Sequence, residues 1–521
     1  MKSSYISIAL GICGALVGTS CADDLDQLPH IEQTTESLYQ TLDDYEAVLA
    51  KIYSTYCTAG NEKGSSNDMT SINGQDFGRC LYNLQEVTTD EVAATWLEGD
   101  KQTELTYHTW DANQAWVNDT YYRCYYNITL CNEFLNRTED SEIARFSESE
   151  QKVLRQYRAE ARYNRAFYYY WVLDLWRKGP KALEENVGKS SAPDVWDAKG
   201  IFDFVESELK ECSELMLSRD ESVYARAPRA AAWMLLTRLY LNAEVYIGTS
   251  KYDECIAYAQ KVIDEGYELN ENYAQLFNAD NDKRTNEIIL HAAVDNTNTV
   301  TWGTTTLMVC GAVPSDKVPD DYDREAMMGS DTGWGSMRAQ SQLVDAFEDE
   351  SDARYMFHKS KDDIKVVTNP LDQAHGYFVM KWTNLNDNGE AVGSATTNGV
   401  STDMPIFRLA EAYLNLAEAV ARGGNGATKA EAAELINKLR TRAGVSSINE
   451  SNITTDYLFG ERTREMYGEL TRRTDLVRYD RFTSGSYLWD LKQSAIDSKY
   501  NYFPIPQSEL TANPNLSNPE Y

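Results

Sequence analysis

Hydrophobic and polar positions follow a helical period through the centre of the chain, from Arg226 to Gly266. Pro228 suits a first helical turn, and the apolar residues after it recur at the spacing of one helix face. These residues are Ala232, Leu235, Leu236, Leu239, Ala243 and Tyr246. A polar turn at 248–250 follows, and a second apolar face then ends at Gly266. The pattern predicts two amphipathic helices joined by a tight turn.

The same pattern recurs on both sides of this centre. Residues 405–422 carry one apolar face and lead into a glycine-rich turn. Thr428 and Glu431 then have the spacing of a capping box at the start of the next helix. A third, degenerate copy combines 151–176 with 201–216. The chain therefore contains at least two helical pairs and the trace of another.

Helical pairs of this length resemble the unit of a tetratricopeptide-type array. One such pair cannot bury its apolar face alone, so several must stack. We predict a mainly α protein in which tetratricopeptide-like helical hairpins form a right-handed scaffold. An irregular, loop-rich region containing short strands accompanies it. Function is then expected in the segments between the helices.

The predicted organisation is a targeting segment, 1–20, followed by one composite body, 21–521. The helical scaffold covers about 36–57, 116–270 and 404–480. Loop-rich insertions cover about 58–115 and 272–403, and the proline-bearing tail 500–521 is expected to lie extended. Local patterns add strands at Glu287–Ala293 and His375–Trp382, a hairpin turn at Asn388-Gly389, a Gly/Thr loop at Thr301–Val313 and a last helix at Tyr457–Tyr479.

The N-terminus has the features of an export signal. Lys2 precedes an apolar run, Ile6–Val17, that is too short to span a bilayer as a helix. Small residues then lead to Cys21, and an acidic run follows. This resembles a bacterial lipoprotein signal in which Cys21 becomes the lipidated first residue of the mature chain. The alternative is an ordinary secretory peptide cut nearby, which leaves a soluble protein.

Composition narrows the possible partners. The 521 residues carry a formal net charge of −32, which argues against nucleic acid and anionic lipid because both repel such a chain. Apart from Cys13 and Cys21, the cysteines are dispersed, and they show no disulfide framework and no zinc pattern. No catalytic cofactor is expected.

Two acidic clusters invite a chemical interpretation. Glu461, Glu465 and Glu469 lie four residues apart, and a glycosidase needs two carboxylates roughly 5–9.5 Å apart. The interleaved arginines favour structural ion pairs instead. A second set could hold a structural calcium ion, which prefers several oxygen ligands. Its members are Asp280, Asp282 and Asp403.

Two C-terminal stretches carry a family resemblance. The tail YFPIPQSELTANPNLSNPEY (502–521) and ERTREMYGELTRRTDLVRYDRF (461–482) are similar to signatures of the SusD/RagB family of Bacteroidetes outer-membrane lipoproteins. The lipoprotein start and the paired helices extend the resemblance over the mature chain. Within the family the chain is most similar to the starch-binding founding member. This similarity lies in Gly74–Asp76, Thr89–Glu91, Asn278–Asp282, Val309–Gly311 and Tyr487–Asp490.

The resemblance implies a binding function rather than an enzyme. Family members sit on a TonB-dependent transporter, capture oligosaccharide at the cell surface and hand it inward. We therefore expect a lipid-anchored outer-membrane protein that captures starch or another α-glucan and delivers it to a SusC-like transporter. The alternatives are a relative that binds a different glycan or peptides and, more remotely, a lipoprotein glycoside hydrolase.

Three tryptophans are the candidate binding residues. Trp96, Trp302 and Trp334 lie among glycine, threonine and acidic residues, where a large ring often forms a surface platform. The same three positions match the aromatic arc of the founding member, and Asp76 and Arg79 match its polar contacts. The alternative, that an indole caps the core under a loop, applies most to Trp96. By contrast, Trp171, Trp176 and Trp233 lie in helical apolar patterns and are assigned to the core.

Overall fold

The computed structural model describes residues 38–66, 75–314 and 317–521, so the predicted signal and Cys21 lie outside the described residues. The chain forms two compact units, Met1–Val48 and Leu49–Tyr521. The described part of the first unit contains the start of helix α1 (Leu42–Ser54). There the Asp44 carboxylate accepts a hydrogen bond from the backbone N–H of Thr41 at 2.8 Å.

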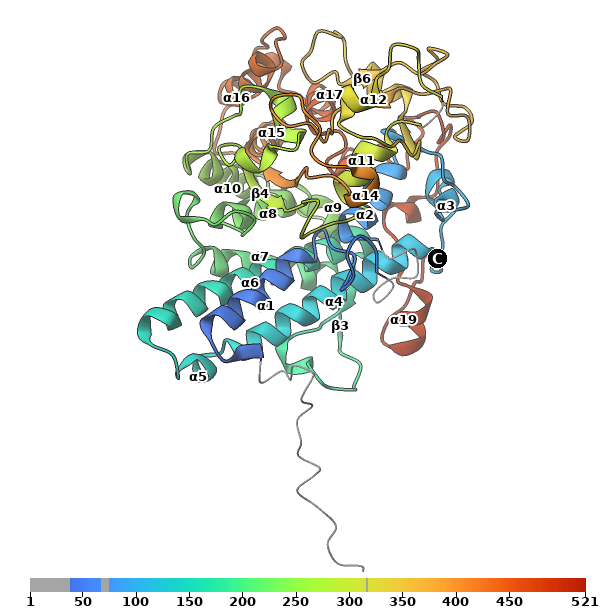
Figure 1. The fold of residues 1–521 in the computed structure, drawn as a ribbon. Coiled ribbons are helices and arrows are strands. Elements are labelled where there is room, and N and C mark those ends of the chain that lie inside the picture. The colour runs from blue at the N-terminus through green and yellow to red at the C-terminus, as the bar shows by residue number, and fades with distance from the viewer. Residues whose placement is uncertain (1–37, 67–74, 315–316) are drawn as a thin grey trace, which may run out of the picture. The chain divides into compact units, whose positions relative to one another are not determined.

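The second unit is mainly helical, which confirms the predicted fold class. Its long helices stack in chain order, each packed against the next (Figure 1). They are α4 (Ala115–Arg137), α6 (Glu148–Trp176), α7 (Ala198–Ser213), α8 (Arg229–Leu241), α10 (Tyr252–Asp264), α15 (Leu409–Ala421) and α16 (Lys429–Arg442). Thr428 and Glu431 form the predicted capping box at the start of α16. The handedness of the scaffold stays a prediction.

Shorter elements fill the segments between these helices. The helices are α2 (Phe77–Tyr82), α3 (Thr103–Tyr107), α5 (Asp140–Ile143), α9 (Ala243–Ile247), α11 (Thr304–Gly311), α12 (Arg324–Met328), α13 (Ser341–Asp345), α14 (Ala395–Asn398), α17 (Thr455–Met466), α18 (Arg472–Arg478) and α19 (Gln507–Ala512). The strands form two-stranded antiparallel ribbons: β1 (Val92–Ala94) with β5 (Met337–Ala339), β2 (Gly179–Pro180) with β3 (Val195–Trp196), β4 (Ile288–Ala292) with β8 (Met404–Arg408), and β6 (Phe357–His358) with β7 (Phe378–Val379).

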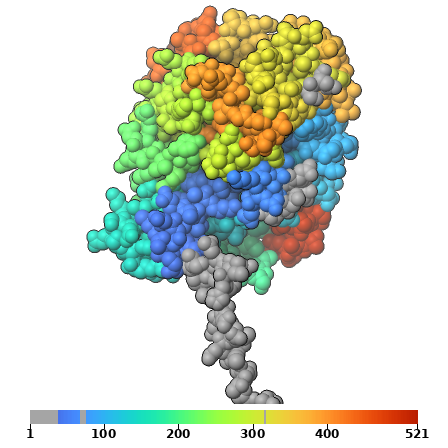
Figure 2. Space-filling view, viewed as in Figure 1, coloured from blue at the N-terminus to red at the C-terminus, as the bar shows by residue number. Residues whose placement is uncertain are grey.

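The β4–β8 ribbon separates a long insertion, 293–403, from the helical stack. Strand β4 follows α10 and β8 leads into α15, with Ile288 opposite Arg408 and Ala292 opposite Met404. Because both ends of the insertion leave from one ribbon, α10 and α15 pack directly on each other. Figure 2 shows the insertion, coloured from yellow to orange, gathered at the top of this face beside the green helices. The helical core is thus continuous across the insertion.

Several sequence predictions of local structure were wrong. Residues 404–408 form a strand rather than the start of a helix, because they pair with β4. The predicted loop 301–313 contains helix α11, and the tail contains helix α19. The predicted helix 457–479 divides into α17 and α18. The break holds two residues with positive φ, Gly468 at 69° and Leu470 at 63°.

A buried network of ion pairs fixes the insertion to the stack. Arg408, at the end of β8, pairs with Glu465 at 2.6 Å and with Glu469 at 2.7 Å. From the insertion, Lys381 pairs with Glu469 at 2.7 Å, and Arg354 pairs with Glu461 at 2.7 Å. All of these side chains are buried. The three glutamates are therefore structural, as the interleaved arginines predicted.

Helix α16 contributes two arginines to the same network. Arg440 pairs with Glu461 at 2.8 Å, and Arg442 pairs with Glu287 at 2.8 Å and with Glu465. The arginine neighbours hold the pKa of Glu461 at about 2 in spite of its burial. Removing one partner from a buried pair typically costs about 3–5 kcal/mol, because the other charge stays buried without compensation.

Two further features of the described residues bear on the sequence predictions. Cys57, Cys80, Cys124, Cys131, Cys212, Cys255 and Cys310 are buried free thiols. Burial raises the pKa of the Cys80 thiol to about 12, so this residue behaves as a small apolar side chain. None of the described helices combines the length and the apolar character needed to cross a membrane.

Glu461→Gln tests the network through its pH dependence. The Glu461 carboxylate stabilises the fold above about pH 5, and this contribution is lost as pH falls from about 4.5 towards 2. A shift from 4.5 to about 2 corresponds to about 3 kcal/mol. We expect the variant to be less stable by that order at pH 7 and to show a shallower loss of unfolding free energy between pH 5 and 3. Urea titrations measure both quantities.

Glu434→Gln is the matched control, since Glu434 is exposed on α16 and the change of charge is the same. This variant should keep the wild-type slope. Equal slopes for wild type and both variants would contradict the role assigned to Glu461.

Candidate functional site

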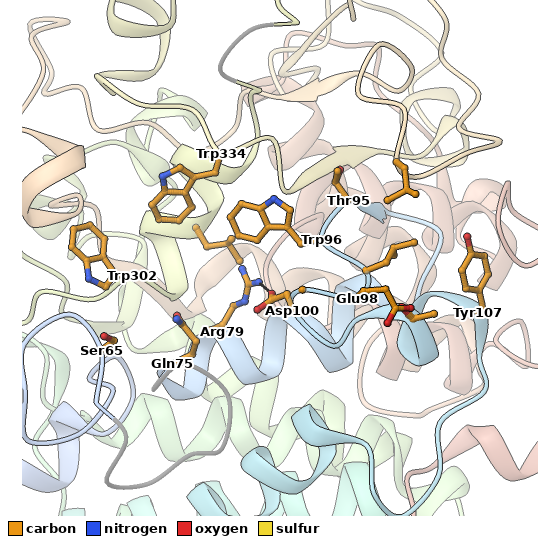
Figure 3. Close-up of a pocket in the computed structure, with 15 residues that line it drawn as sticks. Ser65, Gln75, Arg79, Thr95, Trp96, Glu98, Asp100, Tyr107, Trp302 and Trp334 are labelled. Carbon is orange, nitrogen blue, oxygen red and sulfur yellow. Dashed lines mark hydrogen bonds and ion pairs between the residues drawn. The ribbon is translucent and has the colours of Figure 1, made fainter.

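The three candidate tryptophans line one cavity of about 1000 Å³ (Figure 3). All three indoles are half-buried. The ring centroids of Trp302 and Trp334 lie 6.5 Å apart, and those of Trp334 and Trp96 lie 6.2 Å apart. The rings thus form a continuous row with Trp334 in the middle, which we call the tryptophan row. The planes of neighbouring rings differ by 61° and 31°.

The β1–β5 ribbon brings Trp96 and Trp334 together from distant parts of the sequence. Ala94 lies opposite Met337, and the Thr95 N–H donates to the Ser336 carbonyl at 2.9 Å. Trp96 follows the end of β1 and Trp334 precedes the start of β5, so both lie at the same end of the antiparallel ribbon. On its other side, the Trp334 N–H donates to the Cys310 carbonyl of α11 at 2.6 Å. Backbone hydrogen bonds thus hold the main-chain segments that carry both indoles.

Trp302 is placed by a close contact with a glycine. The Trp302 N–H donates to the Gly64 carbonyl at 3.2 Å, and the Gly64 N–H donates to the Val300 carbonyl at 3.0 Å. A Cβ atom at Gly64 would lie 2.6 Å from Nε1 of Trp302, and the φ of Gly64 is +82°. Only glycine adopts this conformation readily and leaves room for the ring.

Arg79 lies beneath the row and is the polar residue of the predicted set that lines the cavity. It comes from α2, forms an ion pair with Asp100, and lies over the Trp116 ring at 5.4 Å. Burial raises the pKa of Asp100. Within the described part of the chain, Nε of Arg79 has no hydrogen-bond partner. A buried donor without a partner is costly, and the ion pair with Asp100 holds the guanidinium at this position.

Asp76 does not reach the cavity surface. It is fully buried at the N-terminus of α2, where its carboxylate accepts from the Arg79 N–H at 2.7 Å and from the Thr301 hydroxyl. A Cβ atom at Gly303 would lie 2.5 Å from its carboxylate. Asp76 therefore caps α2 and ties it to the loop that carries Trp302, and in this structure it has no direct access to a ligand.

The predicted calcium ligands do not form a ligand set. Asp280 accepts from Lys283 at 2.6 Å and from the Asp387 N–H at 2.9 Å. Asp403 accepts from the Val294 N–H at 2.8 Å and from the Tyr224 hydroxyl, and burial raises its pKa to about 7. Among the described residues no group of three or more His, Cys, Asp or Glu side chains is arranged to hold a metal ion. Asp280 and Asp403 thus have protein partners of their own.

The three tryptophans assigned to the core differ in burial. Trp171 and Trp176 are buried, as predicted. Trp233 is half-buried on α8, with Arg229 and Lys261 within 5.3 Å and 5.6 Å of its ring. It does not line the cavity of the tryptophan row.

Sequence reasoning missed several residues of the cavity lining. These are Ser65, Gln75, Thr95, Leu97, Glu98, Gly99, Asp100, Thr103, Tyr107, Leu307 and Leu371. Four of them, Leu97, Glu98, Gly99 and Asp100, follow Trp96 directly along the chain, so proximity to that indole is the signal that could have found them. Leu371 carries no such signal, because a separate loop brings it to the cavity.

Comparison with known proteins assigns the family. A sequence model of the SusD family matches residues 276–521. The chain is also 33% identical to the starch-binding protein SusD of Bacteroides thetaiotaomicron, in an alignment that covers 100% of both chains. The chain belongs to the SusD family. The predicted resemblance, including the similarity to the starch-binding member, is confirmed.

Solved structures share the SusD-family fold. The surface glycan-binding protein A of Bacteroides uniformis superposes with a TM-score of 0.70 at 21% identity, over 92% of this chain and 99% of its own. The surface glycan-binding protein A of Bacteroides thetaiotaomicron, solved with laminarihexaose, gives a TM-score of 0.70 at 18% identity, with coverage of 92% and 99%. These proteins and the starch-binding SusD are all named for binding a glycan.

Gly64→Ala tests how Trp302 is held. The added methyl group meets the indole, so we expect the ring to move. In protein labelled with 5-fluorotryptophan, the ¹⁹F resonance of Trp302, assigned by Trp302→Phe, should shift. Gly99→Ala is the control, because Gly99 lines the same cavity and a Cβ atom there has no neighbour within 4 Å. A Trp302 resonance that is unchanged in both variants would contradict the contact.

Proposed function

We propose that this SusD-family chain binds starch or a related α-glucan on the tryptophan row. The observation that carries the proposal is that Trp96, Trp302 and Trp334, from two separate insertions, line one cavity. Sugar rings present C–H groups that pack on an indole face, while polar side chains hold their hydroxyl groups. The 33% identity to a starch-binding protein supports the same ligand.

Neighbouring rings of the tryptophan row differ in plane by 61° and 31°, so a ligand that stacks on all three must present its sugar rings at different orientations. A coiled α-glucan can present its rings in this way. Arg79 supplies donors beneath the row, and its pairing with Asp100 leaves the site without an uncompensated positive charge.

The cellular role that we propose follows the family. The chain is lipid-anchored through Cys21 on the outer membrane, and it delivers captured glucan to a SusC-like TonB-dependent transporter. It acts as a binding protein rather than an enzyme. In support, Glu461, Glu465 and Glu469 are buried in ion pairs and line no part of the cavity.

A different glycan is the second candidate. The solved relative with bound laminarihexaose shares the fold and takes a glucan other than starch. The same row would then stack the rings of that polymer. Peptide binding and glycoside hydrolysis are further alternatives that a ligand panel decides.

Trp334→Ala tests the proposed site most severely, because Trp334 contacts both other indoles. We expect the variant to bind maltoheptaose at least about 30-fold more weakly, since removing a central aromatic anchor typically costs about 2 kcal/mol or more. Isothermal titration calorimetry measures the change. Trp233→Ala is the control, because it removes a half-buried indole outside the cavity, and it should bind within twofold of wild type. Equal affinity in wild type and both variants would refute the site.

A panel of ligands tests the specificity. Wild type should bind maltoheptaose. Its affinity for laminarihexaose, galactomannan and peptides should be at least about tenfold lower than its affinity for maltoheptaose. It should also release no reducing sugar from starch. Preference for laminarihexaose would move the assignment to the second candidate, and steady release of reducing ends would establish a hydrolase.

A further inference from the structure

The cavity does not end at the tryptophan row. Beyond Trp96 it continues towards Tyr107, which lies at the opposite end from Trp302 in Figure 3. This part, which we call the distal half, contains Thr95, Glu98 and Tyr107 (Figure 3). The cavity-lining residues Leu97 and Thr103 adjoin Glu98, the second through a hydrogen bond, and Arg338 links the loop of Leu371 to the Thr95 hydroxyl group. The total volume of about 1000 Å³ is at the upper end of the roughly 300–1000 Å³ of small-molecule sites. The tryptophan row occupies only part of it.

Two large apolar side chains of the distal half are open to solvent. Tyr107 is 44% exposed and Leu371 is 61% exposed, although they come from distant segments. Single exposed apolar residues are common on protein surfaces and need no explanation. Two that line one cavity, next to a row of indoles, extend the apolar platform of that cavity.

The backbone holds Tyr107 at the surface. Tyr107 is the last residue of α3, and the next residue, His108, adopts the left-handed conformation with φ 55° and ψ 49°. His108 is buried, its Nε2 lies 2.9 Å from the Thr88 carbonyl, and its ring lies 5.7 Å from both Phe482 and Trp489. A non-glycine residue keeps this conformation only where its surroundings enforce it. The buried His108 therefore fixes the exposed position of Tyr107.

Leu371 is held by an arginine of the ribbon that carries the tryptophans. Arg338, in β5, is buried and donates to the carbonyl groups of Pro370, Asp372 and His375, the last at 2.8 Å. These bonds attach the loop on both sides of Leu371 to the β1–β5 ribbon. The wall formed by Leu371 is therefore fixed relative to Trp96 and Trp334.

Glu98 is the exposed charge of the distal half. Its Oε1 accepts from the Thr103 hydroxyl at 2.9 Å, which orients the carboxylate and leaves it able to accept further hydroxyl groups. The positive charge of Arg79 is already paired with Asp100. The negative charge of Glu98 would repel an anionic sugar, and no free positive charge of Arg79 would offset the repulsion. A neutral sugar would instead donate a hydrogen bond from a hydroxyl group to the Glu98 carboxylate.

We propose that the distal half is a second subsite for further units of a neutral glycan whose other units lie on the tryptophan row. This proposal rests on the proposed function. The Tyr107 ring stacks a sugar ring, Leu97 and Leu371 cover its apolar edge, and Glu98 accepts from its hydroxyl groups. Affinity then increases with glycan length beyond what the three indoles bind.

Calorimetry with a short and a long ligand tests the second subsite. Wild type should bind maltoheptaose at least about tenfold more tightly than maltotriose. Tyr107→Ala should weaken maltoheptaose about tenfold and maltotriose by less than twofold, and Leu371→Ala should act in the same direction. Trp334→Ala should weaken both sugars. Tyr122→Ala and Leu215→Ala are the controls, because these side chains are 38% and 56% exposed outside the cavity lining.

The outcomes separate this proposal from the proposed function. If Trp334→Ala lowers the affinity for maltoheptaose and Tyr107→Ala does not, the second subsite is overturned and binding on the tryptophan row still stands. If Tyr107→Ala lowers the affinities for maltotriose and maltoheptaose by the same factor, the second subsite is also overturned. If wild type binds laminarihexaose instead, the same contrast should appear between laminaritriose and laminarihexaose. If it binds none of these, both proposals fail.

Glu98→Gln tests the preference for a neutral glycan. Maltoheptaose oxidised to the uronic acid at C6 should bind wild type more weakly than maltoheptaose does. The ratio of the two affinities should be at least about threefold smaller in Glu98→Gln than in wild type, since the repelling charge is removed. A difference that is the same in both proteins overturns the role of Glu98.

Discussion

The buried ion pairs around Arg408 are the constraint on which the rest of the structure depends. Arg408 ends the strand through which the insertion returns to the helical stack, and it pairs with Glu465 and Glu469. Lys381 and Arg354 bring the insertion itself to the same glutamates and their neighbour Glu461. Removing one partner from a buried pair typically costs about 3–5 kcal/mol, so a displaced insertion would leave these charges unpaired at a large cost.

The two ribbons convert that placement into a binding surface. The β4–β8 ribbon lets 293–403 leave the stack without interrupting it, and the β1–β5 ribbon then joins this insertion to the segment after Val92. Trp96 and Trp334 meet because they lie next to paired strands. Trp302 joins them through the glycine contact at Gly64. The platform is therefore built from backbone pairing, and the loops contribute mainly the rings.

The helical part of this fold could be predicted from sequence because it depends on local information. Apolar residues at helical spacing located the long helices, and Thr428 with Glu431 located a cap. The errors arose where distant partners decide the local structure. Residues 404–408 form a strand because β4 lies beside them, and the break between α17 and α18 contains Leu470 with positive φ.

The same distinction applies to the site. The polar surroundings of Trp302 and Trp334 pointed to a binding role, and the structure places both on one cavity. Asp76 shows the limit of such reasoning, because a buried helix cap and a ligand contact look alike in a sequence. The acidic residues predicted to bind calcium were likewise ambiguous until Lys283 and Tyr224 appeared beside them. Tyr107 gave no signal, since its exposure depends on the conformation of His108.

A crystal structure of the chain with bound maltoheptaose would show directly whether the glucan lies on the tryptophan row. We expect consecutive sugar rings packed against Trp302, Trp334 and Trp96, with hydroxyl groups near Arg79. Clear density for the sugar at another surface, with the three indoles uncovered, would contradict it.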